Sequence, residues 1–184
     1  MDGAAGMDLI AALSDLCSQN DQPIIAIDGP AGAGKTTLAA NIAIALSLHH
    51  SIQIFHMDDL YDGWDCALGT GLTQTLQDLV KAHKSKKPYK FRKYNWIESC
   101  FGQAQESDSA EVLILEGVGS GQKALREHLS ALIWVDISPE MGLARVLHRD
   151  GDHIEPQMRN WLIAQSEHFA LNSTQEESAF ILTN

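Results

Sequence analysis

One stretch of the chain has glycines, a lysine and a threonine at a spacing that can hold phosphate. Residues 29–36 match GxxxxGK(S/T) at every fixed position, directly after an apolar run and directly before a helical pattern. The glycines let successive backbone N–H groups turn toward phosphate oxygens, and the helix N-terminus adds partial positive charge. Lys35 would reach the β- and γ-phosphates, and the Thr36 hydroxyl would face Mg²⁺. ATP and Mg²⁺ are therefore the expected ligands of this loop, whose predicted binding residues are Gly29, Pro30, Ala31, Gly32, Ala33, Gly34, Lys35, Thr36 and Thr37.

Other nucleotide-binding patterns are absent from the sequence. The loop lacks the GxGxxG fingerprint of dinucleotide enzymes. The chain also has no NKxD guanine motif and no LSGGQ-type signature. A dehydrogenase, a GTPase switch and a transporter ATPase are therefore disfavoured.

Acidic residues follow two of the predicted strands. Glu116 ends the apolar run 112–116, and Asp58 and Asp59 follow the run 51–56. Ligands bind at the carboxyl ends of strands in open α/β sheets, so these side chains can meet the phosphates there. A kinase that acts on an alcohol needs a carboxylate to orient the hydroxyl and to take its proton. Because adjacent side chains of an extended segment point opposite ways, only one of the two aspartates is expected to face the γ-phosphate.

These segments together resemble a known family. Residues 27–37, 58–61 and 115–117 look like the uridine kinase-like branch of the P-loop nucleoside and nucleotide kinases, and the resemblance spans about residues 23–182. The phosphate loop is also similar to that of cytidylate kinases, a local likeness that does not fix the acceptor.

The resemblance implies roles for individual residues. Asp58 would act as the base on the acceptor hydroxyl and lie near Mg²⁺, and Tyr61 would line the acceptor pocket. Glu116 would organise the hydrated Mg²⁺. Leu60 stands where the family usually has Phe.

A helical lid is expected over residues 145–160. Arg145 and Arg149 are four positions apart, so they share one face of the predicted helix, and Arg159 follows the turn at 150–151. The resemblance implies an arginine-bearing lid that closes over the triphosphate. Such an arginine can contribute about 10³ to 10⁵ in rate, so Arg145 and Arg149 are predicted catalytic residues beside Asp58 and Lys35.

A basic segment with aromatic residues is the second candidate for acceptor binding. Seven of the 13 lysines and arginines lie between Lys81 and Lys93. Tyr89, Arg92, Tyr94 and Trp96 could stack on a base or sugar, or the lysines could hold an acceptor phosphate. Tyr61 and Trp64, which precede this segment, complete the predicted substrate residues, and Trp64 could be either a wall of the pocket or plain packing.

Strand and helix patterns alternate along the chain. Apolar runs at 23–27, 51–56, 111–116, 131–136 and 179–182 predict five strands, whereas residues 84–95 show no clear period. Ser138 and Pro139 predict a helix start, with an end near 150–151 and a further helix from 155 to about 171. The prediction is an α/β, three-layer P-loop NTPase fold with a five-stranded, mainly parallel sheet and a helical lid, as one domain over residues 1–184.

Composition narrows the classes of partner. The 184 residues carry 24 acidic and 13 basic side chains, a net charge of −11, which disfavours nucleic acid and anionic membranes. No apolar stretch approaches the roughly 20 residues that span a bilayer, and the Met1-Asp2-Gly3 start has no cationic leader. The three cysteines form no CxxC pair, which fits a reducing cytoplasm.

The leading hypothesis is an ATP-dependent small-molecule kinase that acts on an acceptor hydroxyl. A nucleoside monophosphate kinase is the alternative if the basic segment binds phosphate. An ATP-binding switch or assembly factor with slow hydrolysis is the alternative outside that class. The expected partners are a nucleotide and a small-molecule acceptor, and the sequence leaves a homodimer open.

Overall fold

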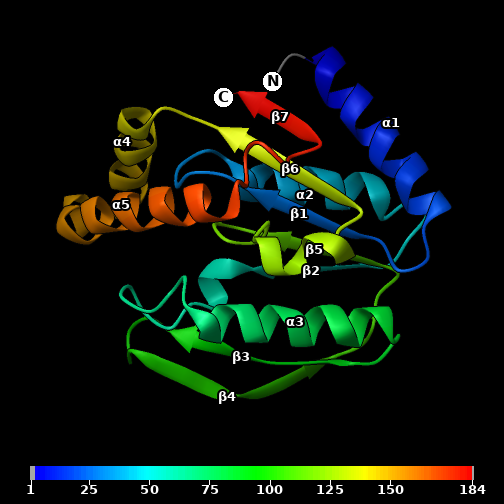
Figure 1. Ribbon diagram of the computed structural model, residues 1–184, viewed down its shortest axis with the longest axis horizontal. Helices are drawn as coiled ribbons and strands as arrows, with labels where there is room; N and C mark the ends of the chain where they lie inside the picture. The colour runs from blue at the N-terminus through cyan, green and yellow to red at the C-terminus, as the bar shows by residue number, and fades with distance from the viewer. Residues whose placement is uncertain (1–2, 184) are drawn as a thin grey trace.

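The main sheet consists of five strands, and every neighbouring pair is parallel. The computed structural model describes residues 3–183, with side chains from Asp8 onwards. The expectation that the chain begins without a cationic leader therefore lies outside the described side chains. The strand order is β2-β5-β1-β6-β7 (Figure 1). The strands are β1 (Ile24–Asp28), β2 (Ile52–His56), β5 (Val112–Glu116), β6 (Ala131–Asp136) and β7 (Phe180–Thr183). All five predicted runs therefore form strands, and the predicted fold class is confirmed.

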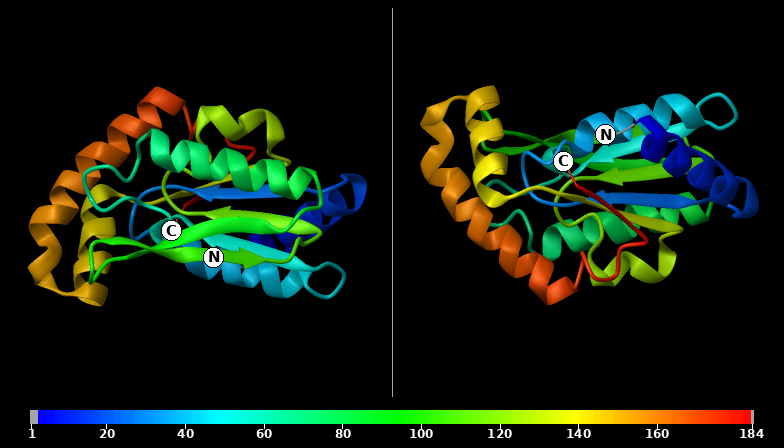
Figure 2. Two further views of the ribbon diagram at one scale, coloured as in Figure 1. Left: turned by 90° about the horizontal axis from the view of Figure 1, so that it is seen from below. Right: turned by 90° about the horizontal axis from the view of Figure 1, so that it is seen from above.

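Helices cover both faces of this sheet, which gives three layers (Figure 2). One face packs against α1 (Gly3–Gln19) and α2 (Lys35–Leu46). The other packs against α3 (Thr70–Lys84) and the short 3₁₀ helix η2 (Lys123–His128). Strands β1 and β5 are completely buried, so they are apolar on both sides, as a covered parallel sheet requires.

Residues 145–160, the expected lid, span the second half of one helix, a short turn and the beginning of the next helix. Helix α4 (Pro139–Asp150) begins at the Ser138 cap, whose side chain accepts from the Met141 N–H, as predicted. A 3₁₀ turn, η3 (Asp152–Ile154), leads into α5 (Glu155–Asn172). Both helices lie across the end of the sheet where the parallel strands finish (Figures 1 and 2). Among the helices of residues 3–183, none has the length and apolar character that crossing a bilayer requires.

A separate antiparallel hairpin was not apparent from the sequence. It consists of β3 (Tyr89–Asn95) and β4 (Cys100–Ser107) and lies beside α3 (Figure 1). A bulge between Arg92 and Tyr94 breaks the alternation of β3, and nearly all of β4 is exposed. The exposed β4 has no hydrophobic period, and in β3 the alternation of Tyr89 and Phe91 toward the core ends at the bulge, so it is too short to reveal a strand.

Candidate active site

The phosphate loop joins β1, the central strand, to α2. Gly29 and Gly32 have φ angles of 138° and 78°, which favour glycine. A Cβ at Gly29 would lie 2.2 Å from the Val135 carbonyl oxygen, and one at Gly32 would lie 2.4 Å from that of Gly142. The loop is thus wedged between β6 and α4, and only glycine fits at these positions.

Asp28 lies beneath the loop and ties it to the segment after β5. Its carboxylate is fully buried and accepts hydrogen bonds from the backbone N–H groups of Gly29, Gly119 and Gly121 at 2.8, 3.1 and 2.8 Å. Burial raises the pKa of Asp28 to about 6, while those N–H groups and Lys35 oppose the shift. Sequence reasoning gave Asp28 no role, because its partners lie 91 and 93 positions further along the chain.

Lys35 extends from the first turn of α2 back over the loop. Its ammonium donates to the Pro30 carbonyl oxygen at 2.8 Å, and the residue is only 7% exposed. Burial lowers the pKa of Lys35, and the nearby carboxylates of Asp28, Glu116 and Asp58 oppose that shift. One cation therefore faces three acidic groups at this point of the site.

Glu116 lies between a threonine and a histidine. Its Oε1 accepts from the Thr36 hydroxyl at 3.2 Å, and its Oε2 is 2.6 Å from Nδ1 of His56. The hydrogen bond to Glu116 raises the pKa of His56, although burial opposes this. The strand register explains the contact, because His56 and Glu116 are directly paired at the ends of β2 and β5. His56 was not among the site residues predicted from the sequence. The signal would have been its position at the end of a strand that pairs with the strand ending at Glu116.

The two adjacent aspartates have different surroundings. They belong to the 3₁₀ turn η1 (Met57–Asp59), directly after β2. Asp58 lines the pocket, whereas Asp59 Oδ2 accepts from the Lys93 ammonium at 2.8 Å. Loss of solvent in the pocket raises the pKa of Asp58, and the Glu116 charge adds to this rise. Of the two aspartates, Asp58 is therefore the one whose carboxylate lines the pocket.

Lys35, Thr36, Asp58 and Glu116 line one pocket of about 660 Å³. The predicted lid arginines, Arg145 and Arg149, both line it. Arg145 approaches the Gly32 carbonyl oxygen at 3.4 Å, and Arg149 makes two hydrogen bonds to Asp150. Arg159 is exposed and pairs with Glu155.

Aromatic side chains form the wall of the pocket away from the loop. Trp64 packs edge-on against Trp96 and Trp161 at centroid distances of 5.3 and 6.1 Å. Tyr61, packed on Trp161, is buried and donates its hydroxyl to the Val118 carbonyl oxygen at 2.8 Å. We call these four residues the aromatic wall. Trp161 was not predicted, because its position on α5 gives no local signal of the pocket.

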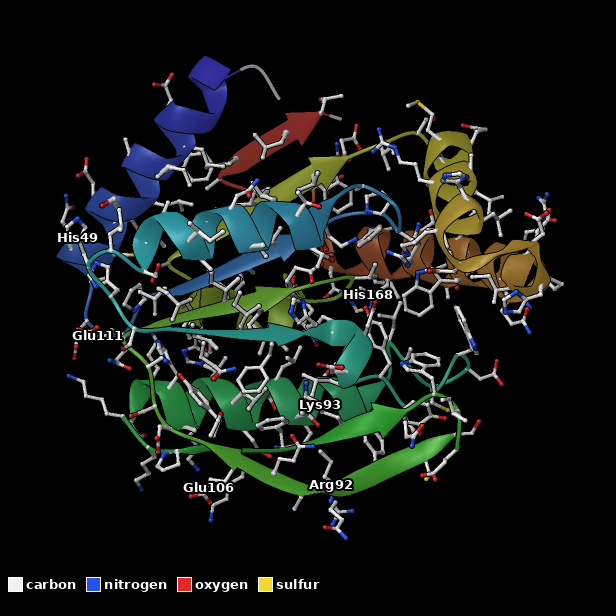
Figure 3. The ribbon with its side chains drawn as sticks, turned by 180° about the vertical axis from the view of Figure 1, so that it is seen from behind. His49, Arg92, Lys93, Glu106, Glu111 and His168 are labelled. Atoms are coloured by element: carbon white, nitrogen blue, oxygen red, sulfur yellow. The ribbon has the colours of Figure 1, made fainter. Side chains whose placement is uncertain are left out.

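Three predicted substrate residues lie away from the pocket lining. Tyr89 is completely buried in the core, where its hydroxyl bonds to His83. Arg92 is exposed on the outer face of the hairpin and points away from the body of the protein (Figure 3). Tyr94 packs behind Trp96 and Phe101 rather than on the cavity. Alternation along β3, together with its bulge, sends these side chains in different directions.

The oxygen atoms at the strand ends suit Mg²⁺. Within residues 3–183, no cluster of three His, Cys, Asp or Glu side chains could hold a metal by itself. Mg²⁺ at phosphoryl-transfer sites is held by one or two carboxylates with substrate phosphates and water. The Thr36 hydroxyl with the Glu116 and Asp58 carboxylates fits that requirement.

Three features of this chain are those of the class of P-loop kinases. They are a parallel sheet, a phosphate loop after its central strand, and arginines on a helix that line the pocket. The chain belongs to the phosphoribulokinase/uridine kinase family, whose model matches residues 70–165, just over half of the chain. The protein is thus a phosphotransferase of this family.

Solved structures share the fold. A possible uridine kinase from Bacillus stearothermophilus matches with a TM-score of 0.67 and 16% identity, over 96% of this chain and 98% of that one. D-glycerate 3-kinase from Cryptococcus neoformans var. grubii matches with a TM-score of 0.64 and 12% identity, over 98% and 96%. No curated protein matches the sequence. The TM-scores establish the fold that the chain shares with these structures. At such low identities the matches leave the acceptor open.

Proposed function

We propose that the protein transfers the γ-phosphoryl group of ATP, in the presence of Mg²⁺, to a hydroxyl group of a small uncharged molecule. The observation that carries this proposal is the convergence of Lys35, Asp58 and Glu116 on a pocket with an aromatic wall. Phosphate, base and acceptor positions can then lie next to one another, as phosphoryl transfer requires.

Each charged group has a separate task in this proposal. Lys35 and the loop N–H groups bind the β- and γ-phosphates. Asp58 accepts a hydrogen bond from the acceptor hydroxyl and takes its proton. Arg145 and Arg149 stabilise the charge on the transferring group. Mg²⁺, when bound, neutralises charge on the β- and γ-phosphate oxygens, and Thr36, Glu116 and Asp58 are the residues proposed to hold it.

The basic segment argues against a phosphorylated acceptor. None of its seven cations is among the pocket-lining residues. Lys86, Lys90 and Lys93 pair with acidic residues, and Lys84 donates to the Gln22 carbonyl oxygen. Recognition of a second phosphate calls for cations that face the acceptor pocket, where charge-assisted hydrogen bonds to it could form. The aromatic wall instead favours an acceptor that offers an apolar face.

The proposal also covers the compartment of the protein and its macromolecular partners. We propose one kinase domain that acts in the cytoplasm on ATP and its acceptor, with no nucleic-acid or membrane partner. The net charge of −11 supports the last point, because polyphosphate backbones and anionic lipids would repel it.

The test is ADP release from ATP·Mg²⁺ with a panel of nucleosides, sugars, other neutral alcohols and nucleoside monophosphates. We expect stimulation by neutral alcohols. Asp58→Asn should lower kcat by about 10²- to 10⁴-fold while ATP still binds. Asp62→Asn is the matched control, because this exposed carboxylate follows the same turn but lies outside the pocket lining, and it should retain turnover.

Other outcomes would redirect the assignment. Preference for monophosphates would favour the nucleotide kinase. ATP binding without stimulation by any acceptor would favour a protein-coupled switch. An unchanged kcat in Asp58→Asn would remove the proposed base.

A further inference from the structure

His56 contacts the acidic residue that the proposed function assigns to Mg²⁺. Its Nδ1 lies 2.6 Å from Glu116 Oε2, a short contact of the charge-assisted kind. A carboxylate oxygen can only accept, so Nδ1 donates. The remaining oxygen of Glu116 accepts from the Thr36 hydroxyl at 3.2 Å. Both oxygens of this carboxylate are therefore held, from β2 on one side and α2 on the other.

The contact is not part of the apolar core. Glu116 is 5% exposed, whereas the His56 side chain is 40% exposed at the pocket end of β2. Neither core cluster of the described residues includes His56. Packing into the core therefore does not explain an imidazole at this position.

We propose that His56 is a positioning residue that fixes the orientation of Glu116 for the Mg²⁺ bound with the nucleotide. This inference rests on the proposed function in assigning Glu116 to Mg²⁺. Without the Nδ1–H bond, the glutamate side chain can rotate about its own torsions, and only Thr36 then restrains it. Partners that hold metal ligands in place typically change metal affinity by about 10- to 100-fold when they are removed.

The experiment measures ADP binding by calorimetry, in Mg²⁺ and separately in EDTA, so no acceptor is needed. His56→Leu removes the donor at similar volume, and His56→Asn keeps a donor near the position of Nδ1. His49→Leu is the control, because His49 lies at the far end of the molecule from the lid helices (Figure 3).

We expect His56→Leu to lose about 10- to 100-fold in ADP affinity in Mg²⁺ and to match the unsubstituted protein in EDTA. His56→Asn should recover most of the loss, and His49→Leu should show none. Restoration by the amide identifies the hydrogen bond, rather than the shape of the side chain, as the cause.

Four results would overturn the proposal. Equal losses in Mg²⁺ and EDTA would mean a general structural role, and a loss in His56→Asn as large as in His56→Leu would exclude the donor. Unchanged Mg²⁺-dependent binding in His56→Leu would mean that the imidazole does not affect the metal site, and tighter binding would mean that it competes with the metal for Glu116. Failure of the Mg²⁺ assignment itself would be distinguishable, because the unsubstituted protein would then bind ADP equally with and without Mg²⁺.

Discussion

The indole N–H of Trp96 donates to the main-chain carbonyl oxygen of Asp58 at 3.0 Å, across 38 positions of sequence. The neighbouring Asp59 accepts from Lys93 of the same hairpin at 2.8 Å. The hairpin therefore holds the turn that carries the proposed base at two points. Trp96 also lines the pocket, so one side chain contributes to both the acceptor wall and the position of Asp58.

Trp96→Phe should keep an aromatic ring in the wall and lose the hydrogen bond to Asp58. The net value of such a bond is about 0.5 to 1.5 kcal/mol, so we expect kcat to fall by about 2- to 10-fold with little change in ADP affinity. Trp64→Phe is the matched variant, because Trp64 lines the same wall without that bond, and it should raise KM for the acceptor more than it lowers kcat. Identical effects of both variants on kcat and KM would contradict the positioning role; steady-state kinetics make the comparison.

Lys35→Ala should weaken nucleotide binding and also lower turnover. Hydrogen bonds to charged groups contribute about 1.5 to 3 kcal/mol, which corresponds to a loss of about 10- to 100-fold in ADP affinity measured by calorimetry. Lys90→Ala removes an exposed lysine that pairs with Glu106 on the hairpin, so it should bind ADP normally. Undiminished binding and turnover in Lys35→Ala would disprove the phosphate-loop assignment.

Gly142→Ala should separate α4 from the phosphate loop. The new Cβ would lie 2.6 Å from the Ala31 carbonyl oxygen, and overpacking of this kind costs about 1 to 3 kcal/mol. Gly71→Ala on α3 meets no atom within 4 Å, so better helix propensity should leave it equal or up to about 1 kcal/mol more stable. Urea unfolding measures both, and similar stabilities would show that α4 can move off the loop at no cost.

His83 contributes stability that should be lost on acidification, because it is buried as the neutral form. Its Nδ1 accepts from the Tyr89 hydroxyl at 2.7 Å, and its Nε2 donates to the Pro23 carbonyl oxygen at 3.1 Å. Burial lowers the pKa of His83 to about 4, below its ordinary value of 6.5. Between these values the unfolded chain binds the extra proton, so the free energy of unfolding falls as pH drops through 6.5.

Between pH 7.5 and pH 5.5, His83 should lower the free energy of unfolding by about 1 kcal/mol. His83→Gln should not show this pH-dependent loss. His49→Gln, a change at an exposed end of the molecule, should still show it (Figure 3). Urea titrations at the two pH values give the comparison. An equal pH dependence in His83→Gln and the unsubstituted protein would mean that His83 is not buried in its neutral form.

Much of the fold was predictable because its signals are local. The strands β1 and β5 are continuous apolar runs, and α4 begins at a Ser-Pro cap, so neighbouring residues alone define them. The hairpin β3–β4 was not predictable, because β4 is exposed and has no hydrophobic period, and the bulge interrupts the short alternation of β3.

The sequence by itself determined the phosphate loop and the strand ends that carry Asp58 and Glu116, since each depends on residue types within a few positions. Only the tertiary structure decided that Tyr89 belongs to the core while Trp161 forms the pocket wall. It also decided that His56 meets Glu116, 60 positions away. These contacts depend on the register of the strands and on how the helices pack against the sheet. Both are set by the packing of the whole chain rather than by any local pattern.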